Sequence, residues 1–570
     1  MDYETENLCD RVKYTREENQ YSQAETKIYW CKHCLIPVYK ERCPLCGKKT
    51  RYLAMDLRPV FPEEILLLEV LLRKKGELRG KSIWNGKGNR YYINGEPLDF
   101  SVQGVLTEWQ PEMVRRQLDE LKALGEDIGQ DEFDEMIARF THANEERLQK
   151  NEYDSFECIR LAVDTYPNRI KMVSFSGGKD STVVSSLARR ALGTSEVLHV
   201  FGDTTLEFPV TYDYVETFRR KNRRVPFLAT RPTPDSTREK GNQRFMELCE
   251  RIGPPSRVMR WCCTTFKTGP ISMLIDYFSE DKQVLTFYGV RSVESTRRSK
   301  YKEVMKSPKI AKQVVASPIM DWLDLDVWLY LLYNKEDFNP AYRQGFSRVG
   351  CWCCPSNSDW AFFLAQIYLP EQAKEWRDFL VGFAKRIGKP DAEEYVDSGN
   401  WKARQGGNGL DVNYEMIKVE PCANEALAKN FYLNRPIESG LYEYFKPFGN
   451  LNYSMGRKLL GEVYVLDRQT QEPVLILQGR EGQPHLKIIA VNPQNFTLLM
   501  KRVECQLRKF QACIFCGACP AICKGKAISL LGDRYSIDEK KCIGCMACVA
   551  YYDLGCLVTK VTKTKIGGSV

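Results

Sequence analysis

The feature that most constrains the fold is a glycine-rich turn with the letters SFSGGKDST at residues 174–182. An apolar, β-prone run precedes it at residues 170–173, and residues 181–192 have the apolar spacing of a helix. The turn therefore lies at a helix N-terminus, where unpaired backbone N–H groups and the helix dipole favour an anion. Adjacent glycines let the backbone close around phosphate oxygens, and Lys179 and Ser181 add a charge and a hydroxyl donor. We predict a phosphate-binding site; the alternative is an ordinary Ser/Gly turn that caps a helix.

Length and composition indicate a modular globular protein. At 570 residues the chain is too long for one core, and roughly 150 residues per domain predicts about three to five domains. Its hydrophobic content of 43% and charged content of 28% are typical of globular proteins. Residues 1–25 lack the apolar run of a signal peptide, and the longest apolar stretch, residues 65–72, is far too short to span a bilayer. We therefore expect a cytoplasmic protein with no membrane partner.

Twenty-two cysteines in such a chain point to metal and cluster ligation instead of disulfides. The formal charge is +9, but four thiolates around a zinc ion or a 2+ cluster carry about −2 in total, so four such sites remove roughly eight units of it. Net charge then says little about partners. Basic runs remain at residues 219–224 and 297–300, and solvated surface explains them as well as a nucleic-acid patch does.

Two C-x-x-C knuckles near the N-terminus resemble a zinc ribbon. They are separated by eight residues, and Gly47 follows the second. Knuckles on hairpin turns aim four thiolates at one tetrahedral centre, which can fold a segment too small to have its own core. The predicted zinc ligands are Cys31, Cys34, Cys43 and Cys46.

The last group of cysteines resembles the C-x2-C-x2-C-x3-C runs of two-cluster bacterial ferredoxins. In that pattern the fourth cysteine of each run ligates the other 4Fe-4S cluster. Two departures are that Lys524 occupies the usual proline position and that seven residues instead of three separate Cys548 from Cys556. Two adjacent clusters usually mean electron transfer, with a purely structural role as the alternative. One predicted ligand set is Cys513, Cys516, Cys519 and Cys556, and the other is Cys523, Cys542, Cys545 and Cys548.

The glycine-rich turn resembles SGGKDS, the PP-loop of the ATP pyrophosphatase superfamily, whose members cut ATP between its α and β phosphates. It differs from the nucleoside-triphosphate loop that ends in Gly-Lys-Ser/Thr after four spacer residues, because its glycines are adjacent and its lysine precedes aspartate. Residues 155–365 further resemble the phosphoadenosine phosphosulfate reductase family, in segments at residues 202–209, 289–298, 318–322 and 326–328. In the first segment Thr205 stands where the family has the glycine of Asp-Thr-Gly.

The resemblance implies a doubly wound α/β fold with an adenine nucleotide, ATP with Mg²⁺, at the carboxyl ends of parallel strands. It makes Lys179, Asp180 and Ser181 the predicted catalytic residues of the turn. Arg291 and Arg298 suit phosphate or sulfate oxygens, although either equally suits a structural ion pair. The predicted nucleotide-binding set is Ser174, Ser176, Gly177, Gly178, Lys179, Asp180, Ser181, Thr182, Asp203, Arg291 and Arg298.

Cysteines inside this region resemble those with which 4Fe-4S sulfonucleotide reductases hold a cluster beside the nucleotide. A vicinal pair is followed after 87 residues by the letters CWCC at residues 351–354. The extra thiol, Cys353, replaces one ligand or acts as a sulfur acceptor, which makes it a predicted catalytic residue. A zinc site or buried thiols are the alternatives. The predicted ligands of this third cluster are Cys262, Cys263, Cys351 and Cys354.

These features divide the chain into six predicted parts. They are a zinc ribbon at residues 1–52, an accessory domain of unknown role at 53–152, a catalytic PP-loop domain at 153–365, a helical extension at 366–440, a small β-rich domain at 441–505 and a ferredoxin-like α+β domain at 506–570.

Two observations argue against a plain reductase. The sequence lacks the Glu-Cys-Gly-Leu-His segment that carries the nucleophilic cysteine of the reductases. Residues 504–507 resemble it only weakly, without its glycine and histidine, and Cys422 is a second weak candidate for the nucleophile. The turn is also complete, which implies ATP as the substrate. The chain then resembles the branch of the family that activates an acceptor with ATP and inserts sulfur, as DNA phosphorothioation proteins and tRNA thiolases do. The acceptor and the sulfur source are open, with tRNA and DNA among the acceptors considered, and an external electron donor and a homodimer fit the sequence.

Two rival hypotheses remain open. The first is an adenylyl- or phosphoadenylyl-sulfate reductase whose fused ferredoxin serves as the reductant. The second is a nucleic-acid-binding iron–sulfur scaffold in which the glycine-rich turn only senses a nucleotide.

Overall fold

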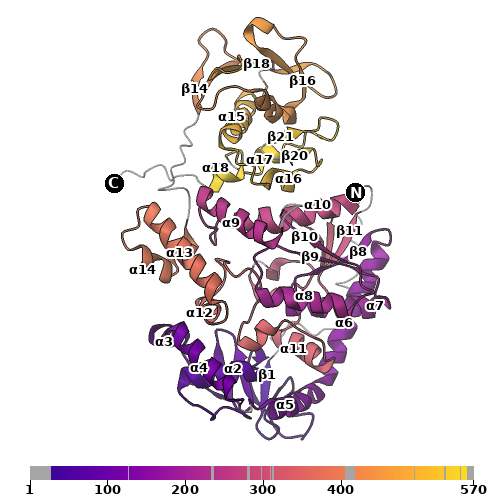
Figure 1. Ribbon diagram of the computed structural model, residues 1–570. Helices are drawn as coiled ribbons and strands as arrows, with labels where there is room; N and C mark the ends of the chain where they lie inside the picture. Colours follow the sequence, from indigo (N-terminus) through magenta and orange to yellow (C-terminus); the bar gives the residue numbers. More distant parts are fainter. Residues whose placement is uncertain are drawn as a thin grey trace. The chain divides into compact units, whose positions relative to one another are not determined.

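The computed structural model describes residues 27–125, 128–232, 237–278, 283–296, 298–307, 310, 313–404, 417–492, 494–531, 534–552 and 554–561. Residues 1–25, where no signal peptide is expected, and Arg297 of the second basic run lie outside this described part. The chain forms two compact units, Met1–Thr230 with Leu274–Trp376 and Arg231–Met273 with Arg377–Val570 (Figure 1). No helix among the described residues combines the length and the apolar character needed to cross a bilayer.

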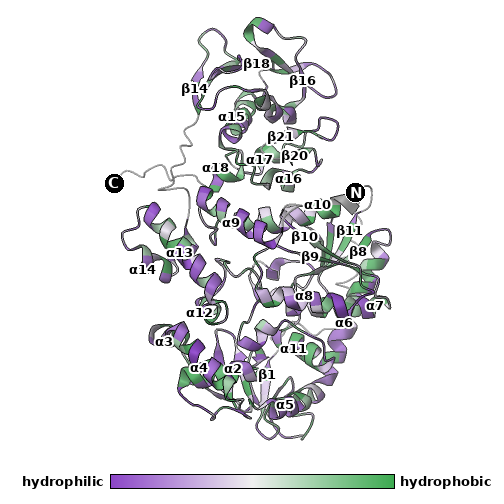
Figure 2. Cartoon of the chain, viewed as in Figure 1, coloured by the Kyte–Doolittle hydropathy of each residue, from purple (hydrophilic) through white to green (hydrophobic). Residues whose placement is uncertain are grey.

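A six-stranded sheet forms the centre of the first unit, in the order β10-β9-β8-β11-β13-β12. All neighbours pair in parallel except β12, which is antiparallel to β13. Helices α6 (Glu145–Thr165), α7 (Lys179–Leu192) and α8 (Pro209–Lys221) pack around it. The strands are largely hydrophobic, as buried parallel strands are (Figure 2). They are β8 (Ile170–Phe175), β9 (Leu198–Gly202), β10 (Phe227–Thr230), β11 (Val284–Phe287), β12 (Val304–Lys306) and β13 (Gln313–Ala316).

The strand order reverses at β8, because β9 and β10 extend the sheet on one side and β11 and β13 extend it on the other. Doubly wound sheets bind ligands at the carboxyl ends of their strands, in the crevice at this reversal point. The turns that follow β8 and β11 are therefore the expected ligand-binding elements. The predicted doubly wound α/β fold is confirmed.

Within residues 27–125 and 128–143, the first unit contains two small antiparallel sheets and four helices. One sheet runs in the order β2-β1-β3, with the predicted zinc ligand Cys31 at the end of β1, and the second sheet runs in the order β4-β5-β6-β7. Phe61 contacts Phe133 at a ring distance of 5.3 Å and Trp328 at 5.2 Å, so the predicted accessory domain shares its core with the PP-loop domain. The elements are β1 (Ile28–Cys31), β2 (Ile36–Val38), β3 (Arg51–Ala54), β4 (Leu57–Pro59), α2 (Pro62–Leu72), β5 (Ile83–Gly86), β6 (Arg90–Ile93), β7 (Glu96–Pro97), α3 (Val102–Glu108), α4 (Pro111–Ala123) and α5 (Gln130–Ala143).

Helices of residues 324–403 follow the sheet and extend into the second unit. Residues 366–440 were expected to be a helical extension, but β14 (Ile417–Pro421) and β15 (Ala428–Leu433) are strands of a six-stranded antiparallel sheet. They join it because apolar residues such as Phe431 and Leu433 pack into its core. The helices are α11 (Asp324–Tyr333), α12 (Asp359–Tyr368), α13 (Pro370–Arg386), α14 (Ala392–Asp397) and the 3-10 turn η5 (Asn400–Ala403).

The second unit combines this sheet with the cysteine-rich C-terminal segment around one core. Tyr444 of the sheet region stacks on Tyr535 of that segment at 4.4 Å. The unit also includes α9 (Arg238–Ile252) and the π-helix η1 (Cys263–Thr268), which leads into α10 (Gly269–Phe278). Its other elements are β16 (Asn450–Asn452), β17 (Glu462–Leu466), β18 (Pro473–Gln478), β19 (His485–Ala490), α15 (Phe496–Ala512), α16 (Ala518–Ile522), β20 (Ile528–Leu531), β21 (Arg534–Ile537), α17 (Ala547–Ala550) and α18 (Leu557–Val561).

Candidate active site

The glycine-rich turn joins β8 to α7 and is fixed by its own hydrogen bonds. Gly177 has a φ of +73°, a left-handed conformation that glycine adopts without a steric penalty. A Cβ atom on Gly177 would lie 2.9 Å from Cγ2 of Thr211, so a side chain has no room there. The Ser181 hydroxyl donates to the Gly178 carbonyl (2.8 Å) and accepts from the Ser176 N–H (3.1 Å), which closes the turn. The backbone is thereby shaped before a ligand arrives.

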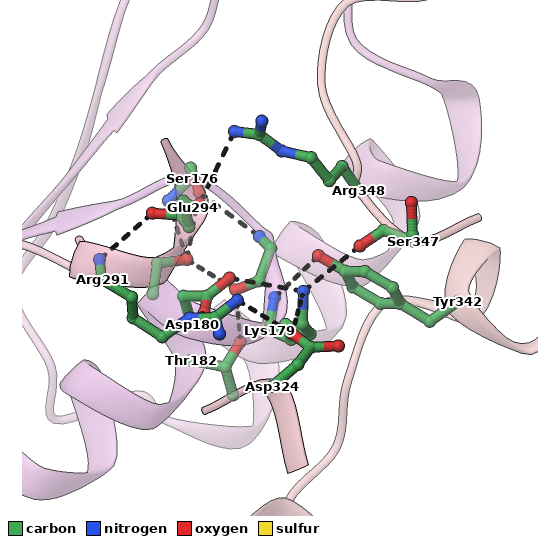
Figure 3. A network of polar contacts seen from close by, with 12 residues as sticks. Ser176, Lys179, Asp180, Thr182, Arg291, Glu294, Asp324, Tyr342, Ser347 and Arg348 are labelled. Atoms are coloured by element: carbon green, nitrogen blue, oxygen red, sulfur yellow. Dashed lines mark hydrogen bonds and ion pairs between the residues drawn. The ribbon is translucent and has the colours of Figure 1, made fainter. Parts of the chain in front are cut away.

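Lys179, the first residue of α7, is buried, with 3% of its surface exposed. Its Nζ atom lies 3.2 Å from Oδ1 of Asp324 and 3.5 Å from Oδ2 of Asp180, and it donates to the Ser347 carbonyl at 3.2 Å (Figure 3). Burial would lower the pKa of Lys179, but the two carboxylates outweigh it and raise that pKa. Lys179 is therefore a fixed positive charge. Its backbone N–H donates to the Tyr342 hydroxyl at 3.0 Å.

Arg291, from the turn after β11, shares both carboxylates with this lysine (Figure 3). Its Nε atom lies 2.6 Å from Asp180 Oδ1, and its Nη2 atom lies 2.8 Å from Asp324 Oδ1. Burial would raise the pKa of Asp180, but Lys179 and Arg291 lower it. A Cβ atom on Gly289 would lie 2.7 Å from the carbonyl carbon of Asp180, so only glycine allows the turn after β11 to approach so closely. Two cations and two carboxylates thus balance each other at the start of α7.

A further carboxylate comes from the N-terminal part of the unit. The Asp56 side chain accepts from the N–H groups of Asp324 (3.0 Å) and Leu325 (3.2 Å), at the first turn of α11. Burial and the neighbouring charge of Asp324 raise the pKa of Asp56 to about 7. Asp56, Asp324 and Tyr342 were not predicted from the sequence, and the only local signal is that Asp324 precedes an apolar helical run, as helix-start residues do.

The remaining predicted nucleotide-binding residues lie around this network. Ser174 is in β8, and the Thr182 hydroxyl contacts the Tyr214 hydroxyl at 2.7 Å. The Asp203 carboxylate, after β9, accepts from the Thr205 N–H at 2.8 Å. Arg298 forms an ion pair with Glu294, the second of the two roles that its sequence context left open.

The CWCC segment is attached to the turn after β9. The Trp352 N–H donates to the Leu206 carbonyl at 2.9 Å, and Cys351 Sγ lies 3.4 Å from the Thr204 hydroxyl. Cys353 is buried, with 2% of its surface exposed. This half of the predicted third cluster therefore lies at the carboxyl edge of the same sheet that carries the glycine-rich turn.

The other half of the predicted third cluster, Cys262 with Cys263, belongs to the second unit. Both cysteines are half-buried, at the start of η1. The cluster that joins the two halves stays a prediction.

The four ribbon cysteines fit a zinc ion. Their sulfur atoms all lie within 4.8 Å of one another, with Cys31 Sγ 3.6 Å from Cys46 Sγ and Cys34 Sγ 3.8 Å from Cys43 Sγ. Zn–S bonds of about 2.3 Å in a tetrahedron require sulfur atoms about 3.8 Å apart. The geometry of the donor atoms thus matches a structural zinc site.

Eight cysteines of the C-terminal segment line two cavities, four in each. The inner cavity, of about 310 Å³, is lined by Cys513, Cys516, Cys519 and Cys556. The outer cavity, of about 320 Å³, is lined by Cys523, Cys542, Cys545 and Cys548. Two-cluster ferredoxin ligation would require the same two sets, because the fourth cysteine of each run then ligates the cluster of the other run. The donor sets fit 4Fe-4S clusters, whose presence stays a prediction.

Known proteins resemble this chain in the region that contains the turn. Residues 170–357 match the phosphoadenosine phosphosulfate reductase domain family. An uncharacterised protein of Methanocaldococcus jannaschii is 33% identical over 271 residues, which are 47% of this chain and 61% of that protein, less than two thirds of its length. Adenosine 5'-phosphosulfate reductase 1 of Bacillus subtilis is 30% identical over 183 residues, 32% of this chain and 71% of that protein. The solved phosphoadenylyl-sulfate reductase of Candida auris is 20% identical, with 35% of this chain and 89% of that chain covered and a TM-score of 0.28.

Proposed function

Because the chain belongs to the phosphoadenosine phosphosulfate reductase family, we propose that it is an enzyme that binds ATP in the turn after β8 and releases pyrophosphate. The adenylated acceptor then receives sulfur in an iron–sulfur-dependent step. The observation that carries this proposal is the complete turn, in which Lys179 is held as a buried cation at the start of α7. A sulfonucleotide, which has already lost the pyrophosphate of ATP, has no β and γ phosphates for this turn to hold.

The residues of the turn have defined roles in this reaction. The N–H groups at the start of α7 and the Lys179 ammonium hold the β and γ phosphates and stabilise the charge that develops on the leaving pyrophosphate. Asp180 and Asp324 already balance the charges of Lys179 and Arg291, so the site has no spare positive charge for a triphosphate. Mg²⁺, which prefers carboxylate and phosphate oxygens, supplies that charge when ATP binds.

The cysteine sites supply the rest of the proposed chemistry. The ribbon cysteines hold a structural zinc ion, and the two C-terminal sets hold clusters that transfer electrons when bound. Cys351 and Cys354, together with Cys262 and Cys263, hold the cluster at which sulfur is transferred. Cys353 is the proposed intermediate carrier of the sulfur, and the adenylated final acceptor, a nucleic acid such as tRNA or DNA, releases AMP when it receives the sulfur.

A sulfite-forming reductase is the second candidate, and one observation favours it. The relative in Bacillus subtilis that is 30% identical to this chain is named adenosine 5'-phosphosulfate reductase 1. In that case the substrate is a sulfonucleotide, and the fused C-terminal clusters deliver the electrons that release sulfite.

One experiment separates these functions. The anaerobically purified protein is incubated in parallel with Mg-ATP, adenylyl sulfate and phosphoadenylyl sulfate. AMP and pyrophosphate from ATP support the proposed function, and sulfite from a sulfonucleotide supports the reductase. Binding of ATP without turnover, together with salt-dependent binding of RNA or DNA, overturns both in favour of a nucleic-acid-binding scaffold. Lys179→Met should abolish AMP formation, whereas Lys385→Met on α13 serves as a matched surface control.

A further inference from the structure

The two C-terminal cavities differ in how far they reach the surface. Of the cysteines that the structure describes, only Cys545 of the outer set is exposed. Its neighbour Ile543, which lines the same cavity, has 65% of its surface exposed. Each set has one buried cysteine, Cys548 in the outer set and Cys556 in the inner one. The two sets therefore differ in that an electron carrier can reach an exposed cysteine, Cys545, in the outer set.

Lysines border the outer cavity. Lys524 is exposed and follows Cys523, and Lys540 and Lys541 are exposed and precede Cys542. The two segments touch, because a Cβ atom on Gly525 would lie 2.5 Å from the Lys541 carbonyl oxygen. Lys524, which replaces the proline of the ferredoxin pattern, thus lies on the same rim as the other two lysines.

Two carboxylates lie among these lysines but are already engaged. Asp538 accepts from the Lys540 N–H at 3.0 Å and lies 3.9 Å from the Lys541 ammonium. Glu539 accepts from the Leu451 N–H at 3.4 Å. Three exposed lysines and two carboxylates leave one net positive charge on this rim, around an exposed isoleucine, and an acidic surface with an apolar centre complements that pattern.

The inner set faces a different neighbour within the same unit. Arg244 of α9 donates to the carbonyl groups of Ile514 (3.4 Å) and Phe515 (3.3 Å), in the loop between Cys513 and Cys516. Helix α16, which follows Cys516 and contains Cys519, packs on η1, and a Cβ atom on Gly269 would lie 2.8 Å from Cβ of Ala521. A helix that carries one cysteine of the inner set therefore contacts the π-helix that begins at Cys263.

We propose that the outer cavity is the electron entry site of this protein and that its basic rim docks an acidic one-electron carrier protein. This inference rests on the proposed iron–sulfur function. Cys523, Cys542, Cys545 and Cys548 would hold a 4Fe-4S cluster that accepts one electron from the reduced carrier, which is thereby oxidised. Cys513, Cys516, Cys519 and Cys556 would hold a second cluster, to which that electron would pass. This transfer would make or break no bond and would move no proton.

Stopped-flow reduction of the full-length, iron-loaded chain tests the proposal. The probe is a small acidic bacterial ferredoxin reduced with dithionite, and the bleaching of the clusters is followed at several salt concentrations. The double variant Lys540→Glu/Lys541→Glu is compared with Lys385→Glu/Lys389→Glu, which makes the same charge change on and just after α13 of the same unit. If the rim steers an acidic partner, reversing its charge should slow the association of the carrier with the protein about tenfold or more at low salt. The control variant should keep the rate and its salt dependence.

Other outcomes overturn the proposal. An unchanged rate in the rim variant means that the carrier docks elsewhere, and an equal loss in both variants means that overall charge, not this rim, sets the rate. The small cationic methyl viologen radical does not depend on a basic docking surface, so it should reduce the rim variant no more slowly than the wild type. Slower reduction by this radical would show that the substitutions damage the clusters, and the slower reaction with the carrier would then no longer support the proposal. Wild-type protein that holds no iron at these cysteines overturns the inference, while ATP turnover, measured separately, decides the proposed function of the turn.

Discussion

Replacing Gly177 with alanine should cost about 2–5 kcal/mol of local stability. Two effects add up at this position. The φ of +73° is a left-handed conformation that costs an L-residue about 1–2 kcal/mol. The new Cβ atom would also lie 2.9 Å from Cγ2 of Thr211, and overpacking of this kind costs about 1–3 kcal/mol.

A double-mutant cycle separates the two effects. Thr211→Ser removes the methyl group but keeps the hydroxyl that accepts a hydrogen bond from Asn339 at 2.8 Å. In this background only the looser 3.2 Å approach to Cγ2 of Val215 remains, so Gly177→Ala should cost mainly the conformational part, about 1–2 kcal/mol, and the coupling energy should be about 1 kcal/mol or more. Hydrogen exchange of the β8 amides in increasing urea measures the opening of this region alone. Equal costs of Gly177→Ala in both backgrounds would refute the steric reasoning, and unimpaired ATP binding by the single variant would show that the shape of the turn is not needed.

Three further predictions concern the first unit. Cys46→Ser should lower the zinc content by about one ion per chain and speed hydrogen exchange in β1–β3, whereas Cys422→Ser should leave metal content unchanged; equal zinc in both variants would exclude the ribbon as its site. Glu64→Gln should destabilise the unit by about 3–5 kcal/mol, because it leaves the buried Arg58 without the carboxylate that lies 2.6 Å away, and urea unfolding with no loss would contradict a buried ion pair. Burial lowers the pKa of His199 to about 4, so stability should fall as the pH drops from 6.5 towards 4, by up to about 3 kcal/mol; a His199→Gln variant with the same pH slope would assign the loss to other groups.

The sequence was informative wherever function depends on local spacing. The turn between β8 and α7 was predictable because its glycines, lysine and serine are consecutive residues. Spacing likewise grouped the eight C-terminal cysteines into two sets of four, and each set lines one cavity, while their role as cluster ligands stays a prediction. Thr205 has a φ of +66°, a left-handed conformation that a β-branched residue disfavours and that its sequence does not predict.

Residues that act across long sequence separations were not predictable. Asp324 lies 145 positions after Lys179, and Asp56 lies 123 positions before it, so only the folded sheet brings the three together. The same limit applies to the missed strand β15, one of whose partners in the sheet, β19, comes much later in the chain, whereas β14 pairs with β15 in a local hairpin.

The central claim is that the phosphates of ATP bind at the start of α7. A crystal structure of the anaerobic protein with Mg²⁺ and α,β-methylene-ATP, which cannot be cut between its α and β phosphates, tests it most directly. We predict that the β and γ phosphates contact the Lys179 ammonium and displace the Tyr342 hydroxyl from the Lys179 N–H, with Mg²⁺ beside the carboxylates of Asp180 and Asp324. Phosphates bound away from this turn, or a Lys179 N–H that stays bonded to Tyr342 with no nucleotide at saturating concentration, would contradict this claim.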